Sequence, residues 1–470
     1  MIFSSLPFLF FFLPLFFGAY FLMPNRTARN IILLAASLIF YAWGEPVYIF
    51  LMLFSIMCDY IFGYYVSKNV AEDKKNIAKR YVAASVILNL LVLGFFKYYD
   101  FIILNLRLIP GLSGLEPLGL SLPIGISFYT FQTMSYTIDI YRGDAKAQNN
   151  ITAFGAYVAA FPQLVAGPIV RYRTIAEELR GRVENMPEFA EGLRRFTAGL
   201  MKKVFIANNM AAVADAILAY SPNRAGALGM WIAVLAYTLQ IYFDFSGYSD
   251  MAIGLGRMLG FHYLENFNYP YISRSVTEFW RRWHISLGTF FRDYLYIPLG
   301  GNRVSVPRWV LNIMIVWLLT GLWHGAEWTF ILWGLYFGVL LLLEKLFLEK
   351  TLLKFRIFGH LYTIAAFIFG WVIFRAESVA HIGVILSAMF GSHGEGSLFD
   401  LAAAGTIKPI YIVAGITGVI CSMPVAVKIR EFLVKRNLAV IIDIASVCAL
   451  LYCGATLAQG AYNPFIYFRF

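Results

Sequence analysis

The chain has 470 residues, of which 60% are hydrophobic and only 14% are charged. Soluble globular proteins are about 25% charged, so this composition excludes water as the main solvent and predicts a membrane protein. The net charge of +11 gathers in loops between apolar runs, which is typical of cytoplasmic loops and disfavours nucleic-acid binding.

Apolar runs with lengths close to that of a membrane-spanning helix recur along the whole chain. The first run has no basic residue before it and is followed by Arg26 and Arg29. This is the reverse of a secretory signal peptide, so we expect the run to remain, with the N-terminus outside. With the basic loops inside, twelve segments alternate across the bilayer, at 6–23, 31–43, 47–66, 81–101, 123–140, 204–220, 228–245, 309–323, 328–343, 357–374, 403–424 and 437–458. The sequence therefore predicts an all-α polytopic membrane protein with about 11–12 transmembrane helices.

Three further segments do not fit this alternation. Residues 171–203 form the longest polar stretch, and apolar residues recur there at helical spacing among Arg and Glu, which predicts a cytoplasmic amphipathic segment on the interface. Residues 151–167 and 250–260 are apolar without fitting a crossing, which predicts re-entrant or buried helices and favours a hollow core. No linker or repeat divides the chain, so we expect a single domain over residues 1–470 with an extracytoplasmic tail at about 459–470.

Two acids lie in the apolar stretch at the end of the seventh predicted span. Asp244 and Asp250 need partners in such surroundings, and we expect them to serve as structural or supporting residues. Gly254, Gly256 and Gly260 follow. Because a glycine-rich run binds nucleotides only after a strand, we interpret these glycines as sites of close helix packing.

The next motif combines aromatic residues, two arginines and a histidine. Apolar residues between Val276 and Leu287 form one stripe at helical spacing, which predicts an interfacial helix with His284 at the edge of the stripe. This histidine is a candidate second catalytic group. Arg281 and Arg282 point elsewhere and could bind an anionic donor such as the phosphates of coenzyme A. The alternative is a membrane-surface helix whose arginines pair with lipid.

The sharpest motif is the segment Gly321–Trp328, between two apolar stretches. The apolar stretch before it, Trp309–Trp323, would make about 22 Å of helix, which is short of a hydrocarbon core of about 30 Å. Because both flanks are basic, the segment predicts a hairpin that rises from the cytoplasm with His324 at its tip. An ionisable residue at that depth is a functional candidate. The alternative is a histidine that only holds the helix break together by hydrogen bonding.

Together these motifs resemble those of the membrane-bound O-acyltransferases, in particular the bacterial alginate O-acetyltransferase branch. The resemblance covers nearly the whole chain, in order, and rests on residues 122–129, 141–144, 161–168, 242–250, 279–286, 292–303 and 323–325. It implies a ring of membrane helices around a pinched central tunnel, open to a donor from the cytoplasm and to an acceptor outside. It also implies that His324 is the catalytic histidine and that His284 is its companion.

The resemblance implies O-acetyl transfer at the bacterial inner membrane. The donor would be a cytoplasmic acyl thioester, acetyl-CoA first, and the acceptor an exported polysaccharide such as alginate, with peptidoglycan or cellulose as alternatives. A separate extracytoplasmic protein that resembles an acetyltransferase or esterase would complete the transfer. D-alanyl transfer from a carrier protein to teichoic acid stays open within the same class. A membrane transporter is the alternative from another class, although no inverted repeat is visible.

The chain ends in an aromatic tail that contains Tyr467. A disordered external tail would not carry so much apolar area, so we expect it to dock, either at the tunnel mouth or on a partner. Similar C-terminal motifs in the family suggest that the Tyr467 hydroxyl carries the acyl group between enzyme and partner. The alternative is a tail that only docks.

The remaining site residues are neighbours of the histidines in sequence. We expect Trp283 and Trp323 to contact substrate, and Glu327 to support the site together with the two acids of the seventh span. We expect no bound cofactor. No metal site is predicted, because the four cysteines lack metal-ligand spacing and are most simply packing residues.

Overall fold

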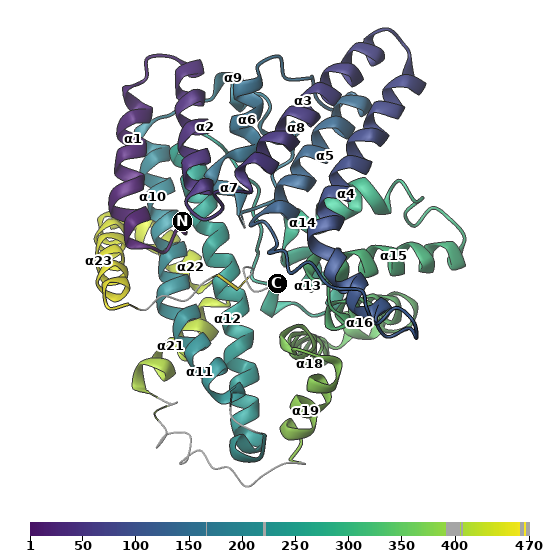
Figure 1. The fold of residues 1–470 in the computed structure, drawn as a ribbon. Coiled ribbons are helices and arrows are strands. Elements are labelled where there is room, and N and C mark those ends of the chain that lie inside the picture. The colour runs from purple at the N-terminus through teal and green to yellow at the C-terminus, as the bar shows by residue number, and fades with distance from the viewer. Residues whose placement is uncertain (166, 220–221, 392–404, 406–407, 461–464, 467–470) are drawn as a thin grey trace. The chain divides into compact units, whose positions relative to one another are not determined.

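The computed structural model describes residues 1–470 apart from 166, 220–221, 392–404, 406–407, 461–464 and 467–470 (Figure 1). The secondary structure of the described residues consists of helices, with no β-strand among them, and these residues form two compact units. Unit 1 comprises Met1–Phe196 and Ser249–Leu264, and unit 2 comprises Thr197–Tyr248 and Glu265–Phe470. The all-α prediction is confirmed, whereas the single domain stays a prediction.

Unit 1 contains the first half of the helices. They are η1 (Phe8–Phe12), α1 (Leu13–Leu22), α2 (Arg26–Ala42), α3 (Ile49–Ala71), α4 (Lys75–Leu106), α5 (Ile126–Arg142), α6 (Ile151–Ala159), α7 (Phe161–Leu164), α8 (Tyr172–Ile175), α9 (Glu178–Gly181) and most of α10 (Met186–Met201). Asparagine side chains start α2 and α6, where Asn25 and Asn150 accept backbone N–H bonds at 2.9 and 2.8 Å. Every residue from Ala153 to Val165 is buried, which confirms a buried pair of short helices at 151–167.

A buried polar cluster joins α3, α4 and α5. The carboxylate of Asp59 accepts hydrogen bonds from Ser85 at 2.6 Å and from Asn89 at 2.8 Å, and the Asn89 oxygen accepts one from Thr133 at 3.1 Å. All four side chains are buried. Because lipid offers no hydrogen-bond partners, such contacts hold membrane helices together.

A second polar cluster ties the start of α2 to the loop before α10. Arg26 and Arg29 both pair with Glu184, which also accepts a hydrogen bond of 2.6 Å from Tyr20. The basic residues after the first apolar run therefore lie beside the predicted cytoplasmic segment 171–203. This is the arrangement expected if both lie on one side of the membrane, although the side itself stays a prediction.

Unit 2 contains the second half of the helices. They are η2 (Lys202–Ala207), α11 (Asn208–Leu218), α12 (Pro222–Met258, with its last residues in unit 1), η3 (Pro270–Ile272), α13 (Val276–Arg282), α14 (Ile285–Phe291), η4 (Arg292–Tyr296), α15 (Val306–His324), α16 (Trp328–Leu343), η5 (Glu344–Leu348), α17 (Glu349–Lys354), α18 (Arg356–Arg375), α19 (Val379–Met389), α21 (Pro409–Cys421), α22 (Val425–Lys435) and α23 (Ala439–Ala458). Figure 1 shows that α15 runs in a clearly different direction from α12.

Seven described helices are long and apolar enough to cross a membrane, or eight if the bent pair α21 and α22 is one span. The seven are Ile49–Ala71, Lys75–Leu106, Ala225–Met258, Val306–His324, Trp328–Lys354, Arg356–Arg375 and Ala439–Ala458. Every one of the twelve predicted spans overlaps a helix of the structure, but the others are shorter, bent or less apolar. The chain is therefore a multi-pass membrane protein.

Two predicted boundaries need correction. Residues 186–218 form one uninterrupted helix through η2, so the second half of the polar segment 171–203 begins the helix predicted at 204–220. Residues 250–258 are the end of α12 and are buried apart from Arg257, so the buried-helix alternative is confirmed, but the segment continues α12 and is not a separate piece. Here α10 and α12 approach each other closely. A Cβ added at Gly254 would lie 2.5 Å from the carbonyl oxygen of Gly192, so the glycines permit this backbone contact.

Candidate active site

His324 lies at the tip of a tight helical hairpin, as the sequence predicts. Helix α15 ends at His324 and α16 begins at Trp328. Glycines allow the two backbones to touch, since a Cβ added at Gly321 would collide with the carbonyl oxygen of Phe330 and lie 3.4 Å from Gly334. The backbone contact sits one helical turn before His324 and fixes its position.

Aromatic rings surround His324, which is only 5% exposed. Its ring centroid lies 5.0 Å from that of Trp323, 4.9 Å from that of Trp333 and 5.3 Å from that of Phe374. These rings come from α15, α16 and α18. The imidazole is therefore held in a site that excludes bulk water.

His284 does not lie on the edge of an interfacial helix, and that prediction is wrong. Helix α13 ends at Arg282, and His284 has a left-handed backbone with φ of 45° directly before α14. The break is made by Asn266, whose side-chain oxygen accepts bonds from the N–H and hydroxyl of Ser286 at 3.1 and 2.8 Å. A side chain that caps α14 in this way ends the continuous stripe.

The same asparagine determines the tautomer of His284. A backbone N–H can only donate, so the Asn266 atom that faces Ser286 is the oxygen. The His284 Nδ1 atom lies 3.1 Å from this oxygen and must therefore carry a hydrogen. Burial lowers the pKa of His284 to about 3, so the ring is neutral near pH 7 and Nε2 bears the lone pair.

The structure brings His284 and His324 to the same indole. The Trp323 ring centroid lies 5.8 Å from that of His284 and 5.0 Å from that of His324. Trp283 instead packs in an aromatic core against Phe279, Tyr271 and Trp371, and Glu327 is exposed in the hairpin link. The assembled group is thus His284, Trp323 and His324.

Both acids of the α12 motif have cationic partners, as expected for charges in apolar surroundings. In unit 2, the Asp244 carboxylate lies 2.5 Å from Lys203 Nζ, and both side chains are buried. In unit 1, Asp250 accepts hydrogen bonds of 2.8 and 2.5 Å from Arg195. Asp244 also accepts a 2.7 Å hydrogen bond from the backbone N–H of Ile466.

The expectation that the tail docks is confirmed for two of its residues. Phe465 and Ile466 are 2% and 3% exposed, and the Phe465 ring contacts Phe245 and Tyr248 on α12. Tyr467 lies outside the described residues. The docking surface for this part of the tail is therefore within the chain itself.

The two predicted donor arginines differ in their surroundings. Arg282 pairs with Glu278 at 2.9 Å and donates to the carbonyl of Asn268. Arg281 is exposed and lines a pocket of about 340 Å³ together with Arg274, Ser275, Thr277, Glu278, Glu344, Lys345, Glu349, Leu352 and Leu353. Glu344 is buried and engaged by the backbone N–H groups of Val276 and Thr277.

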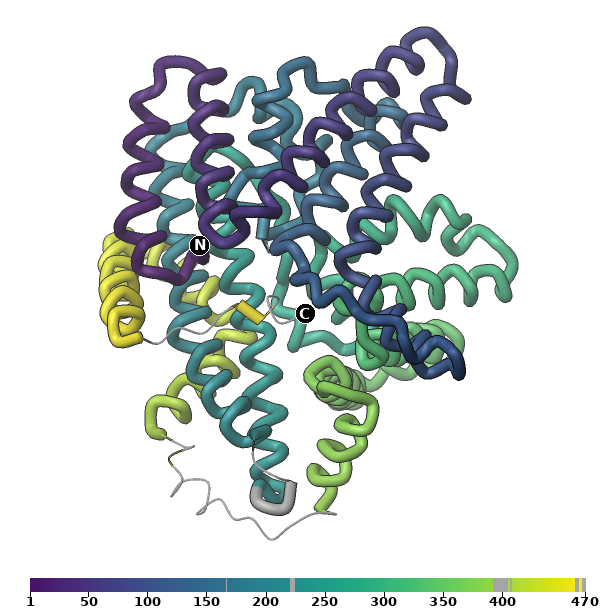
Figure 2. The backbone as a smooth tube through the Cα atoms, in the orientation of Figure 1, coloured from purple at the N-terminus to yellow at the C-terminus, as the bar shows by residue number. Residues whose placement is uncertain are grey.

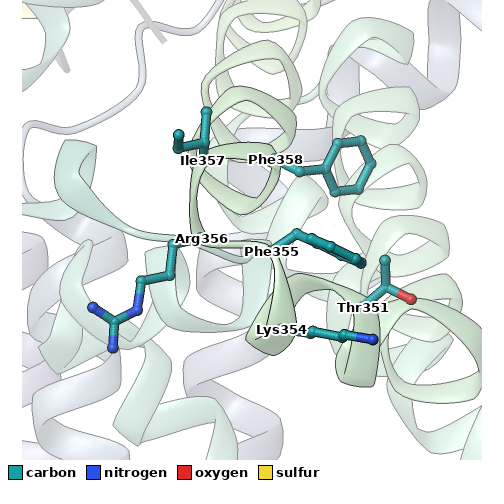
Figure 3. Close-up of a pocket in the computed structure, with 6 residues that line it drawn as sticks. All are labelled: Thr351, Lys354, Phe355, Arg356, Ile357 and Phe358. Atoms are coloured by element: carbon teal, nitrogen blue, oxygen red, sulfur yellow. The ribbon is translucent and has the colours of Figure 1, made fainter.

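Figure 3 shows a second, more open hollow where α17 meets α18, with a volume of about 870 Å³. Its lining residues are Thr351, Lys354, Phe355, Arg356, Ile357 and Phe358. Lys354 and Arg356 point to opposite sides of the chain (Figure 3). The two cations do not converge on one point, so the pocket at Arg281 is the better candidate for an anion.

Several residues that contact the predicted site residues carry no direct signal in the sequence. Lys203 and Arg195 sit in a polar stretch that predicts an interfacial location, and Asn266 has no motif that marks it. Trp333 and Phe374 are ordinary aromatic residues of apolar helices. The sequence contains only an indirect signal for the two cations. Asp244 and Asp250 lie in apolar surroundings and each needs a cationic partner, and the nearest basic stretch along the chain provides both partners.

Comparisons with known proteins identify relatives of this chain. The profile of MBOAT, the membrane-bound O-acyltransferase family, matches residues 145–386. A protein of Azotobacter vinelandii named "probable alginate O-acetylase" is 46% identical over 432 residues, which cover 89% of this chain and 85% of that protein. The peptidoglycan O-acetyltransferase of Helicobacter pylori is 37% identical over 84% of this chain and 80% of its own length, and the teichoic acid D-alanyltransferase of Bacillus subtilis is 30% identical over 50% of this chain and 61% of its own length.

The low pKa of His284 predicts a pH dependence of stability. The unfolded chain binds a proton at this residue below about pH 6.5, whereas the folded chain does so only near pH 3. This contribution is complete above pH 6.5 and declines as the pH falls below it, by about 2–3 kcal/mol at pH 4.5. His284→Gln should not show this loss.

The measurement is denaturant unfolding in detergent at pH 7.5 and 4.5 for both proteins. The cost of the substitution itself is the same at both pH values and cancels. A difference between the two proteins that does not change with pH would contradict a neutral, buried His284.

Proposed function

Because this chain belongs to the membrane-bound O-acyltransferase family, we propose that it moves an acetyl group from a cytoplasmic thioester, acetyl-CoA, to an extracytoplasmic polysaccharide. The membrane O-acyltransferase activity itself follows from the family match and from relatives that cover most of the chain. Alginate is the favoured acceptor because the alginate O-acetylases are more similar to this chain than the peptidoglycan enzyme. D-alanyl transfer is less well supported, since that relative matches only half of the chain.

The observation that carries the proposal is the placement of two buried histidines against one indole. In the reaction, an acceptor hydroxyl attacks the thioester carbonyl, a new C–O bond forms and the C–S bond breaks. His324 accepts the hydroxyl proton as general base and returns a proton to the leaving thiolate. Aromatic walls keep water from competing as acceptor.

His284 has a different role in this proposal. Its ring is neutral and its Nδ1–H is committed to Asn266, so only Nε2 can accept a proton or a hydrogen bond. A fixed tautomer orients that nitrogen for one task. We assign His284 to positioning the donor or acceptor beside Trp323, and His324 to proton transfer.

Donor recognition is assigned to the pocket at Arg281. Arg281 and Lys345 are exposed there, while Glu344 and Glu278 are engaged by α13 and by Arg282. Guanidinium and ammonium groups hold the phosphates of a coenzyme A thioester by charge-assisted hydrogen bonds. In this proposal the attacking hydroxyl is that of Tyr467, which becomes an acetyl ester as the C–S bond breaks. An external partner at the bacterial inner membrane then cleaves this ester as it moves the acetyl group to a polymer hydroxyl, and the Tyr467 hydroxyl is restored.

His324→Ala should leave an inserted, folded protein whose polymer acetylation is at background, at least about 100-fold below the unmodified chain, since a general base is removed. Acetyl groups on exported polymer are measured after expression in a strain that lacks the native enzyme. His381→Ala, half-exposed and outside the site, is the matched control and should be fully active. Unchanged acetylation in His324→Ala would end the catalytic assignment.

Arg281→Glu should raise the donor concentration for half-maximal acetylation about tenfold, the equivalent of about 1.4 kcal/mol in binding. The reason is that a carboxylate would repel the donor phosphates. Arg356→Glu places the same charge change in the open hollow of Figure 3 and should have no such effect. If both variants needed the same donor concentration for half-maximal acetylation, the alternative that Arg281 only pairs with lipid would be favoured.

Tyr467→Phe keeps the aromatic ring and removes only the hydroxyl. Under the relay, a stably expressed Tyr467→Phe protein should lose polymer acetylation. The matched control is Tyr462→Phe, in the same tail. Full activity of Tyr467→Phe would leave Tyr467 as a docking residue.

A further inference from the structure

We propose that the buried pair of Lys203 and Asp244 is a latch that docks the C-terminal tail on α12 beside His284, and that Asp244 is thereby a positioning residue for acyl transfer. The docking part stands on contacts of the chain alone. Only its effect on activity rests on the proposed function.

The two carboxylate oxygens of Asp244 have different partners. Oδ1 lies 2.5 Å from Lys203 Nζ, and Oδ2 accepts the backbone N–H of Ile466 at 2.7 Å. A carboxylate this deeply buried is costly unless a cation and hydrogen-bond donors satisfy it. Lys203 supplies the charge and fixes the carboxylate orientation, which directs Oδ2 toward the tail.

The described tail residues, 465 and 466, make an apolar contact next to this hydrogen bond. Figure 2 shows this short yellow stretch of backbone beside the teal tube of α12. The Phe465 ring centroid lies 4.8 Å from that of Tyr248 and 5.9 Å from that of Phe245. Ile466 is buried as well. A backbone hydrogen bond to a buried anion together with a buried aromatic ring is a specific attachment, unlike the loose packing of a fraying end.

One ring connects the latch to the candidate active site. Phe245 packs edge-on against His284 with ring centroids 4.7 Å apart, and it contacts Phe465 as well. A docked tail thus supports the ring that supports His284. It also fixes the chain immediately before Tyr467, the residue to which the relay is assigned.

The first test separates the hydrogen bond from the side chain of Ile466. Both Ile466→Pro and Ile466→Ala lose the buried aliphatic group, but only proline removes the N–H that Asp244 accepts. Docking is read from a photo-crosslinking benzoylphenylalanine at position 465, with adducts mapped by mass spectrometry onto residues 242–248. The crosslink should persist in Ile466→Ala and fall at least tenfold in Ile466→Pro, and equal yields in the two variants would overturn the latch.

The second test separates the latch from a merely structural ion pair. The double variant Lys203→Asp with Asp244→Lys exchanges the charges and restores a buried pair. It also places an ammonium group next to the Ile466 N–H, and an ammonium group cannot accept a hydrogen bond. The double variant should elute as a folded protein and lose the crosslink. A folded double variant with the crosslink intact would show that the pair serves packing alone.

The activity arm decides the positioning role. Ile466→Pro should lower polymer acetylation at least tenfold while the acetyl-CoA concentration for half-maximal thiol release stays the same, because the donor pocket is untouched. Lost crosslink with normal acetylation would refute positioning. If the unmodified chain released no thiol from acetyl-CoA, the proposed function would be wrong. The crosslink yields would still test the latch, because they do not depend on activity.

Discussion

The buried pair of Lys203 and Asp244 sets a condition that the surrounding helices of unit 2 must meet. Removing one partner of such a pair typically costs about 3–5 kcal/mol, because the other charge is left without water. The helices must therefore approach closely, and glycines permit it: a Cβ at Gly247 would lie 2.8 Å from the carbonyl oxygen of Gly199. Lys203 itself lies in the π-helical stretch η2, a local widening that is frequent at functional sites.

The two histidines illustrate how the same side chain is given different properties by its neighbours. His284 has a polar partner on one nitrogen, a strained backbone and an aromatic ring packed edge-on. His324 ends a helix inside a set of aromatic rings. Trp323 lies against both, so their separation is determined by one rigid side chain on the same helix as His324.

Much of the fold could be predicted from the sequence because apolar length and charge position are local properties. The hairpin that carries His324 follows from two apolar stretches, a short break and basic flanks. The break before His284 could not be predicted, since it depends on Asn266, which is distant in sequence and unmarked by any pattern. Likewise, helical spacing alone does not predict that Arg195 in α10 and Lys203 in η2 pair with the acids Asp250 and Asp244. Residue spacing does not predict the chemical role of the Tyr467 hydroxyl, because that role depends on the groups around it.

The glycine contact between α15 and α16 has a consequence for how this segment can vary in length. Gly321 fixes the rotation of α15 one turn before His324, so one extra residue between them would turn the imidazole by about 100° around the helix axis, away from Trp333 and Phe374. The exposed residue Glu327 follows the histidine, so an extra residue there would not rotate the imidazole. Gly325 in the same link is buried, and a Cβ added to it would collide with the Phe330 ring. Insertions tolerated within the hairpin should therefore cluster after His324 and be absent before it.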